Sequence, residues 1–314
     1  MNKLTKVGLT ALASTLVAGS VSAAEMSASG SAAMTFTGGD EKSNQGNGWT
    51  MADSVTFSAS GDVNDIGVTL TLELDGDGGD GTNQLDNQSI AFDLGDMGSL
   101  TFAGHGGSSA MSAKDDVMPT AYEEPWDIVT GAEAQLIDGH SGNNMFTYSY
   151  SHDSGVTLTA AYLNASAAVN DVSYSDFGIE YTGMEGLTVG YAQGDVEATT
   201  NSKSDQSTMY AKYAIGAVTV GVQMSENDSE SGQDYESTGF GISYQVNDDL
   251  AVSYGSQDME KVNHADPDQE ASAFSLSYTM GSLGISASVF NVDNVANSTT
   301  NDRKAYQFGL SFAF

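Results

Sequence analysis

The stretch that decides the fold is KAYQFGLSFAF, residues 304–314, at the C-terminal end of the chain. Successive side chains of a β-strand point to opposite faces. The pattern therefore predicts a strand with one broad aromatic face and one small, polar face. The two faces are Tyr306, Phe308, Leu310, Phe312 and Phe314 against Ala305, Gln307, Gly309, Ser311 and Ala313.

Sixteen segments in all show this period-two pattern, and sixteen is an even number. Their second face consists of Ser, Thr, Gly, Gln, Asp and Glu, whereas a soluble sandwich or barrel needs an apolar interior. A wet interior and an apolar exterior predict an all-β fold, a transmembrane antiparallel β-barrel of 16 strands. The expected strands are 26–36, 50–60, 66–75, 86–94, 98–104, 143–151, 155–164, 172–182, 186–196, 206–214, 217–226, 235–246, 249–259, 270–280, 283–293 and 303–314.

The connections between these segments alternate in length. Those at 61–65, 183–186 and 281–283 are tight, whereas 37–49 is long and polar. Short turns on one rim and long loops on the other are typical of outer-membrane barrels. The longest connection, 105–142, is expected to be ordered because it carries apolar and aromatic anchors: Tyr122, Trp126, Ile128, Val129, Leu136 and Ile137.

The N-terminal segment 1–23 has two lysines, then an apolar stretch, then small residues up to Ala23. This order predicts a secretory signal peptide that is absent from the mature protein, so 24–314 is expected to form the barrel. Past residue 23 no apolar run approaches the ~20 residues of a membrane helix. Any membrane crossing is therefore expected to use strands.

The composition is strongly acidic. There are 42 acidic residues and nine basic ones, and removal of Lys3 and Lys6 with the signal peptide leaves seven basic residues. Nucleic acid is excluded as a partner, because binding it requires a basic surface. This acidity favours a surface that interacts with divalent cations or that functions in salt solution. The chain has no Cys, which excludes disulfides and thiol chemistry.

The mature chain resembles the trimeric Gram-negative general porins, most closely the alphaproteobacterial ones. The resemblance rests on the sixteen segments, on the terminal Phe314, and on the run GSLTFAGH…YEEPWDIVTG…GNNMFTYSY around 105–142. A strand that ends on an aromatic residue, here Phe314, resembles the C-terminal assembly signal of outer-membrane barrels. The resemblance implies a homotrimer in outer-membrane lipid, acting as a passive diffusion channel for ions and small hydrophilic solutes.

In that family the third external loop folds into the barrel and narrows the pore, and its acids face a basic cluster across the lumen. In this chain 105–142 occupies the place of that loop. The resemblance implies that the constriction acids are among its seven carboxylates: Asp115, Asp116, Glu123, Glu124, Asp127, Glu133 and Asp138.

The basic side of the constriction departs from the family pattern. Arg303 is the only arginine, and Lys212 is the only lysine that the alternation places mid-strand on the inward face. Lys114 lies in the loop itself. We therefore expect a net negative constriction, with Lys212 and Arg303 as its basic residues, and a preference for cations.

One acidic segment invites a calcium interpretation. Asp75 and Asp77 have the first spacing of an EF-hand loop, but the sixth position is Asp80 where glycine is needed. Two interpretations stay open: an irregular Ca²⁺ site that includes Asp75, Asp77 and Asp80, or a flexible external loop. In the family such a loop latches onto a neighbouring subunit. No other cofactor is expected.

Catalysis finds no support in the sequence. His105, His140, His152 and His264 have no zinc-binding spacing, and no G-x-S-x-G motif occurs. We therefore expect no enzyme. The alternatives to a general channel are a substrate-specific channel, which would need an aromatic or charged track, and a non-conducting barrel acting as an adhesin or structural protein, which would need a blocked lumen.

Segment 26–36 differs from the others because one of its faces is small: Ala28, Gly30 and Ala32 alternate with serines. Small residues let backbones approach closely. We expect this face to be a seam between subunits; a misassigned register is the alternative.

Overall fold

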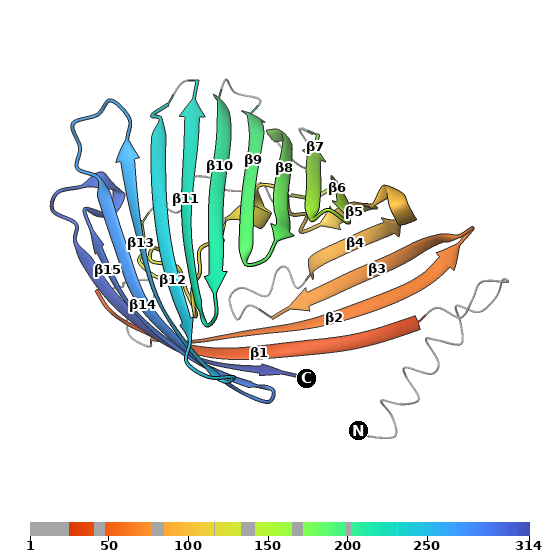
Figure 1. Ribbon diagram of the computed structural model, residues 1–314, viewed down its shortest axis with the longest axis horizontal. Helices are drawn as coiled ribbons and strands as arrows, with labels where there is room; N and C mark the ends of the chain where they lie inside the picture. Colours follow the sequence, from red (N-terminus) through yellow and green to blue (C-terminus); the bar gives the residue numbers. More distant parts are fainter. Residues whose placement is uncertain are drawn as a thin grey trace.

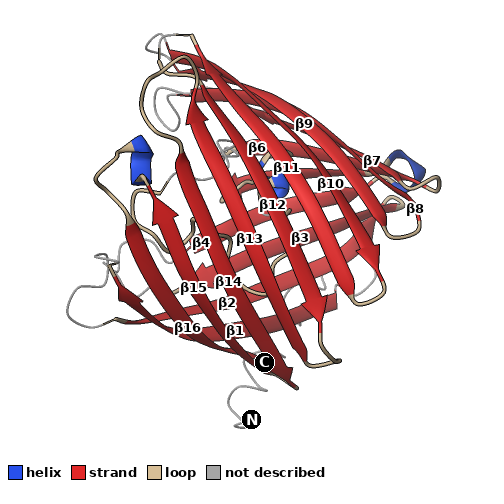
Figure 2. Ribbon diagram, turned by 60° about the vertical axis from the view of Figure 1, so that its left-hand side comes forward, coloured by secondary structure: helices blue, strands red, loops and turns tan. Residues whose placement is uncertain are grey.

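The computed structural model describes residues 25–40, 48–76, 85–115, 117–132, 142–164, 172–198, 202–230 and 232–314. These residues form sixteen β-strands in one closed antiparallel barrel, in which each strand pairs with its sequence neighbours and the first pairs with the last (Figures 1 and 2). The predicted fold is confirmed. The predicted signal peptide, 1–23, lies outside the described residues.

The strand bounds follow the predicted segments to within four residues: β10 starts four residues earlier than predicted, and β1, β2 and β11 each end three residues later. The strands are β1 (Glu25–Gly39), β2 (Trp49–Val63), β3 (Ile66–Asp75), β4 (Leu85–Asp93), β5 (Ser99–His105), β6 (Met145–His152), β7 (Val156–Leu163), β8 (Val172–Met184), β9 (Leu187–Ala198), β10 (Ser202–Ile215), β11 (Val218–Ser229), β12 (Tyr235–Gln245), β13 (Leu250–Lys261), β14 (Gln269–Met280), β15 (Leu283–Asp293) and β16 (Arg303–Ala313).

Three short 3-10 helices, which the sequence pattern did not predict, occur among the described residues: η1 (Gly95–Met97), η2 (Ser112–Lys114) and η3 (Val295–Asn297). None of the helices in the described part of the chain is long and apolar enough to span a membrane.

The barrel is apolar outside and polar inside. Phe177 and Phe274 are 51% and 50% exposed although both are large and apolar, because they point outward from the barrel wall. Their neighbours Asp176 and Ser275 point inward and are buried against other polar groups. This is the polarity that the strand alternation predicts.

The barrel closes where the quoted C-terminal strand meets the first strand. β16 pairs with β1 from Ala313↔Ser31 to Ala305↔Gly39. Beyond the last pair, the amide of Phe314 donates to the carbonyl of Gly30 at 2.9 Å, and the amide of Gly30 donates back at 2.8 Å. The chain therefore uses its last residue to complete the seam of the barrel.

The small face of β1 does lie on the outside, as the predicted register requires, but Gly30 has a neighbour within its own chain. A Cβ built on Gly30 would lie 2.7 Å from Cε2 of Phe314. The small size of this residue thus makes room for the C-terminal ring. A contact with another subunit is therefore not needed to explain why residue 30 is a glycine.

Candidate functional site

The connection after β5 turns into the barrel and lines its inner wall, visible as the yellow trace behind the green and cyan strands in Figure 1. Its two ends are held together at the wall, because Gly107 and Gly142 exchange backbone hydrogen bonds of 3.0 and 2.9 Å. We call the described residues between them, 108–115 and 117–132, the inner loop. The inward fold of the third loop is therefore observed directly.

The first anchor of the inner loop is a buried carboxylate on β8. Oδ2 of Asp176 accepts the amide of Met111 at 2.6 Å and the hydroxyl of Tyr174 at 3.1 Å. The side chain of Met111 is fully buried with Met145 and Leu163 from the neighbouring wall. Apolar packing and a charge-assisted hydrogen bond together fix the start of the inner loop against β6–β9.

The second anchor is a charged cluster that joins the inner loop to β8 and β10. Nζ of Lys114 lies 3.3 Å from Oε2 of Glu180, and the hydroxyl of Tyr210 donates to the same oxygen. Lys114 and Lys212 both lie against the ring of Tyr210, with their Nζ atoms 5.8 and 5.7 Å from its centroid. Both cations thus lie within cation–π distance of one aromatic ring, while Lys114 also pairs with Glu180.

The third anchor depends on glycines in the wall. Pro119 lies against Gly221 of β11 and Gly241 of β12, where an added Cβ would lie 2.6 and 2.9 Å from Cδ of the proline. The amide of Ala121 then donates to Oγ of Ser253 at 2.8 Å. Glycine in a strand often marks close approach of another backbone, and here that backbone is the inner loop.

Tyr122 holds the middle of the inner loop to the closing strand. Its hydroxyl donates to Oε1 of Gln307 on β16 at 2.6 Å. Its ring lies over Gly309, where a Cβ would be 2.9 Å from the hydroxyl oxygen. Burial raises the pKa of Tyr122 from its ordinary value of 10 to about 12, with a smaller opposing effect from its hydrogen bond to Ser286.

The far end of the inner loop packs against the connection between β15 and β16. Val129 and the buried Val295 of η3 share an apolar cluster with Phe290 of β15. Arg303 donates from Nη1 to the carbonyl of Thr130. Around η3 the backbone has positive φ at Asn294 (55°), Ala296 (56°) and Asn297 (55°), which is costly for an alanine. The packing of Val295 on the inner loop offsets this strain.

The predicted constriction acids have different environments. Asp115 and Glu123 are half-buried and Asp127 is exposed, whereas Glu124 is only 6% exposed. Oδ2 of Asp127 accepts the amide of Glu124 at 2.7 Å and so shapes the turn of the inner loop. The remaining three predicted acids, Asp116, Glu133 and Asp138, lie outside the described residues. Which carboxylates meet the permeating solute stays a prediction.

The two predicted basic residues both face inward and both contact the inner loop or its anchors. Lys212 belongs to the cluster around Tyr210, and Arg303 binds Thr130 near the long-loop rim. They do not lie together on a wall opposite the inner loop. The strands β1 to β9 contain neither lysine nor arginine. Their inward positions carry hydroxyls such as Thr71 and Ser89, and the carboxylates Glu73 and Asp75.

The candidate metal site is only partly described. Asp75 ends β3, while Asp77 and Asp80 lie outside the described residues. Within the part of the chain that the structure describes, no group of three or more His, Cys, Asp or Glu could hold a metal ion. His105, His152 and His264 lie in separate parts of the barrel, and His140 falls in an undescribed segment.

Sequence reasoning missed the residues that hold the inner loop. Asp176, Glu180, Gln223, Gln307 and Tyr210 are the polar or aromatic residues on the inward face that meet it. A signal was present, because these side chains are larger than the Ser, Thr and Gly of most inward positions. Which segment they bind could not be inferred from the alternation.

A closed sixteen-stranded barrel with an apolar exterior and a loop folded against its inner wall defines the class of channel-forming outer-membrane barrels. A family model described as Gram-negative porin matches residues 8–274. The chain belongs to the Gram-negative porin family and is a protein of the outer membrane. No match was found among curated proteins.

Solved structures share the fold at low sequence identity. A loop L8 deletion mutant of OmpT from Vibrio cholerae superposes with a TM-score of 0.75 at 17% identity, covering 93% of this chain and 100% of that one. An anion-selective porin from Comamonas acidovorans gives 0.71 at 12%, covering 93% and 100%. Salmonella typhi OmpF in complex with daunomycin gives 0.67 at 13%, covering 92% and 97%. At these identities the likeness establishes the fold alone.

Proposed function

We propose that this chain is a general diffusion channel that passes ions and small hydrophilic solutes and prefers cations. The observation that carries the proposal is the distribution of charge in the lumen. Nine consecutive strands, β1 to β9, contain neither lysine nor arginine, and Glu73 and Asp75 face the lumen from β3. Lys114 of the inner loop and Lys212 of β10 are the inward lysines near β8, and Lys114 is paired with Glu180. Confined carboxylates raise the local concentration of cations.

The proposed mechanism is steric sieving beside the inner loop combined with electrostatic selection, with no catalytic step. Selectivity does not follow from the shared fold, since the Comamonas acidovorans structure is that of an anion-selective porin. It follows from the side chains of each lumen. The rim that carries the short turns, Glu25 and Phe314 is proposed to face the periplasm.

The experiment is the zero-current potential across a KCl gradient in a planar bilayer. We expect cation preference that weakens as the Debye length falls from about 10 Å at 0.1 M to about 3 Å at 1 M salt. Changing Glu73→Gln with Asp75→Asn should reduce it. The control pair, Asp195→Asn with Glu197→Gln, removes two acids from the outer face of β9. Anion preference in the unmodified channel would overturn the proposal.

We further propose that the protein is a homotrimer and that 1–23 is its signal peptide. The outward small face of β1, with Ala28 and Ala32, supports a tight contact with another copy.

Calcium binding by 74–88 also stays a proposal. Isothermal titration with CaCl₂, repeated with Asp75→Asn, tests it, and the absence of a heat signal in the unmodified protein would refute it.

A further inference from the structure

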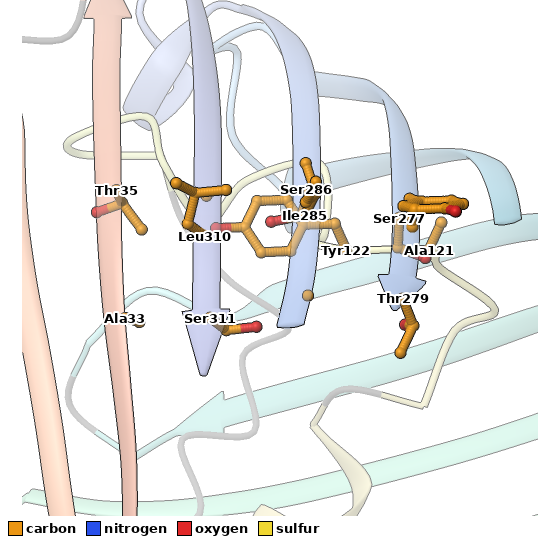
Figure 3. Close-up of a pocket in the computed structure, with 13 residues that line it drawn as sticks. Ala33, Thr35, Ala121, Tyr122, Ser277, Thr279, Ile285, Ser286, Leu310 and Ser311 are labelled. Atoms are coloured by element: carbon orange, nitrogen blue, oxygen red, sulfur yellow. The ribbon is translucent and has the colours of Figure 1, made fainter. Parts of the chain in front are cut away.

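A pocket of about 260 Å³ opens on the lumen beside Tyr122, between the inner loop and the short-turn rim. Four neighbouring strands, β14, β15, β16 and β1, form its wall (Figure 3). The lining side chains that carry hydroxyl groups are Tyr122, Thr35, Ser277, Thr279, Ser286 and Ser311. The volume lies just below the ~300–1,000 Å³ of pockets for drug-sized ligands. It therefore suits one ring of a small solute.

Glycines in the barrel wall leave the space that forms the pocket. A Cβ on Gly284 would lie 2.3 Å from Oγ of Ser311, and a Cβ on Gly309 would lie 2.6 Å from Oγ of Ser286. At both positions the missing side chain leaves room for a neighbouring hydroxyl to lie close to the wall. The backbone of the barrel thus forms the floor of the pocket, and hydroxyl groups surround it.

Three of the hydroxyls are available to a solute. Those of Ser277, Thr279 and Ser311 have no hydrogen-bond partner among the residues that the structure describes, whereas Ser286 bonds to Tyr122 and Thr35 to Thr50. Each serine or threonine hydroxyl can donate one hydrogen bond and accept others. The rigid barrel strands hold the three hydroxyls in fixed positions, so little conformational entropy is lost on binding.

The pocket contains no charged side chain, although the lumen as a whole is acidic. A cation gains nothing specific from it, and an anion finds no positive partner. The chemistry that fits is a neutral solute with several hydroxyls that can both donate and accept, and with a flat C–H face that can lie against the Tyr122 ring. Hydroxyl groups and one aromatic face are the groups that such a molecule needs.

We propose that this pocket is a weak binding site for neutral polyhydroxylated solutes of the sugar class, so that the channel favours them over other neutral solutes of equal size. The proposal rests on the proposed function as a diffusion channel and names one of its solute classes. Retention beside the constriction raises the local concentration of the solute at the narrowest part of the path. Its passage then depends on hydroxyl chemistry as well as on size.

The test uses the full-length channel in planar bilayers with KCl, to which either a neutral disaccharide or a polyethylene glycol of the same hydrodynamic radius is added. We expect the disaccharide to reduce conductance with saturation and with excess current noise. The polyether, which has few hydroxyl donors, should reduce conductance in proportion to its concentration. Equal, non-saturating effects of the two solutes would overturn the proposal, whereas an absence of KCl conductance would overturn the proposed function itself.

A matched pair of triple variants locates the site. Ser277→Ala, Thr279→Val and Ser311→Ala together remove the three hydroxyls, and should raise the half-saturating disaccharide concentration at least about tenfold, at roughly threefold per hydrogen bond. The control removes the same groups from β2, β3 and β4: Ser58→Ala, Thr71→Val and Ser89→Ala, which face the lumen elsewhere. A similar loss in both variants, or in neither, would place binding outside this pocket.

Discussion

The hydroxyl of Tyr122 donates to Oε1 of Gln307 at 2.6 Å, and Nε2 of the same glutamine donates to Oγ1 of Thr37 at 3.2 Å. Gln307 belongs to β16 and Thr37 to β1, the two strands that close the barrel. One side chain thus links the inner loop to the closing seam. The position of the inner loop and the integrity of the seam are therefore coupled.

Tyr122→Phe should loosen the inner loop without unfolding the barrel. The ring stays, but the buried residue Gln307 (9% exposed) loses the donor to its Oε1, at a cost of about 1–3 kcal/mol. We expect more frequent brief closures in single-channel records at unchanged full conductance. Tyr306→Phe is the control, because Tyr306 points outward from the neighbouring position. Equal behaviour of both variants would show that the hydrogen bond does not hold the loop.

The raised pKa of Tyr122 gives a pH dependence. Burial raises it to about 12 from 10, so the folded state holds this proton more tightly than the unfolded state does. The contribution to stability is fully present below pH 10 and is lost as pH rises from 10 to 12. Spectrophotometric titration at the phenolate band, as the difference between unmodified protein and Tyr122→Phe, should be flat through pH 11. A midpoint near 10 would contradict the buried environment.

Removal of Phe314 should prevent assembly. The residue supplies two backbone hydrogen bonds to Gly30 and a ring that packs over it. We expect little folded protein in the outer membrane after deletion of Phe314. Gly30→Leu should give a smaller loss, because the flexible ring can rotate away. Ala160→Leu is the control, since Ala160 is a small, exposed residue beside the outward Phe177, on a part of the wall far from the β1–β16 seam. Normal yield after the deletion would refute this role.

The positive charge of Lys212 should oppose the preference of the channel for cations. This lysine is an inward cation beside the Tyr210 ring, and its removal leaves Glu180 with less positive charge nearby. Lys212→Met is expected to shift the zero-current potential further toward cation selectivity, most clearly at low salt. Lys203 lies on the outer face of the same strand, where it pairs with Glu197, so Lys203→Met should have no effect. A shift in both variants would indicate a general effect of net charge.

Arg303 should stabilise the far end of the inner loop. Its guanidinium binds the carbonyl of Thr130, close to the packing of Val129 on Val295. Arg303→Gln is expected to increase open-channel current noise and to expose 117–132 to added protease. Lys304→Gln changes the next residue, which points outward, and should leave both measurements unchanged. If the two variants behave alike, the inner loop does not depend on this contact.

The sequence by itself determined the barrel. The alternation of side chains is a local property with a period of two, so it identified the strands, their number and the face that each residue presents. The inward position of Lys212 and the outward position of Ala28 and Gly30 followed from the same parity, and the structure confirms them. Strand ends were less well predicted because polar loop residues continue the pattern of the wet face.

Only the tertiary structure decided what the inner loop binds and why particular small residues occur. Met111 meets Asp176 across 65 residues and Tyr122 meets Gln307 across 185. No local pattern encodes such pairs, because they depend on how the closed barrel brings distant strands to one lumen. The closed seam places the Phe314 ring against Gly30, a contact that no pattern within β1 indicates. The sequence specifies the faces of each strand, and closure of the barrel specifies their partners.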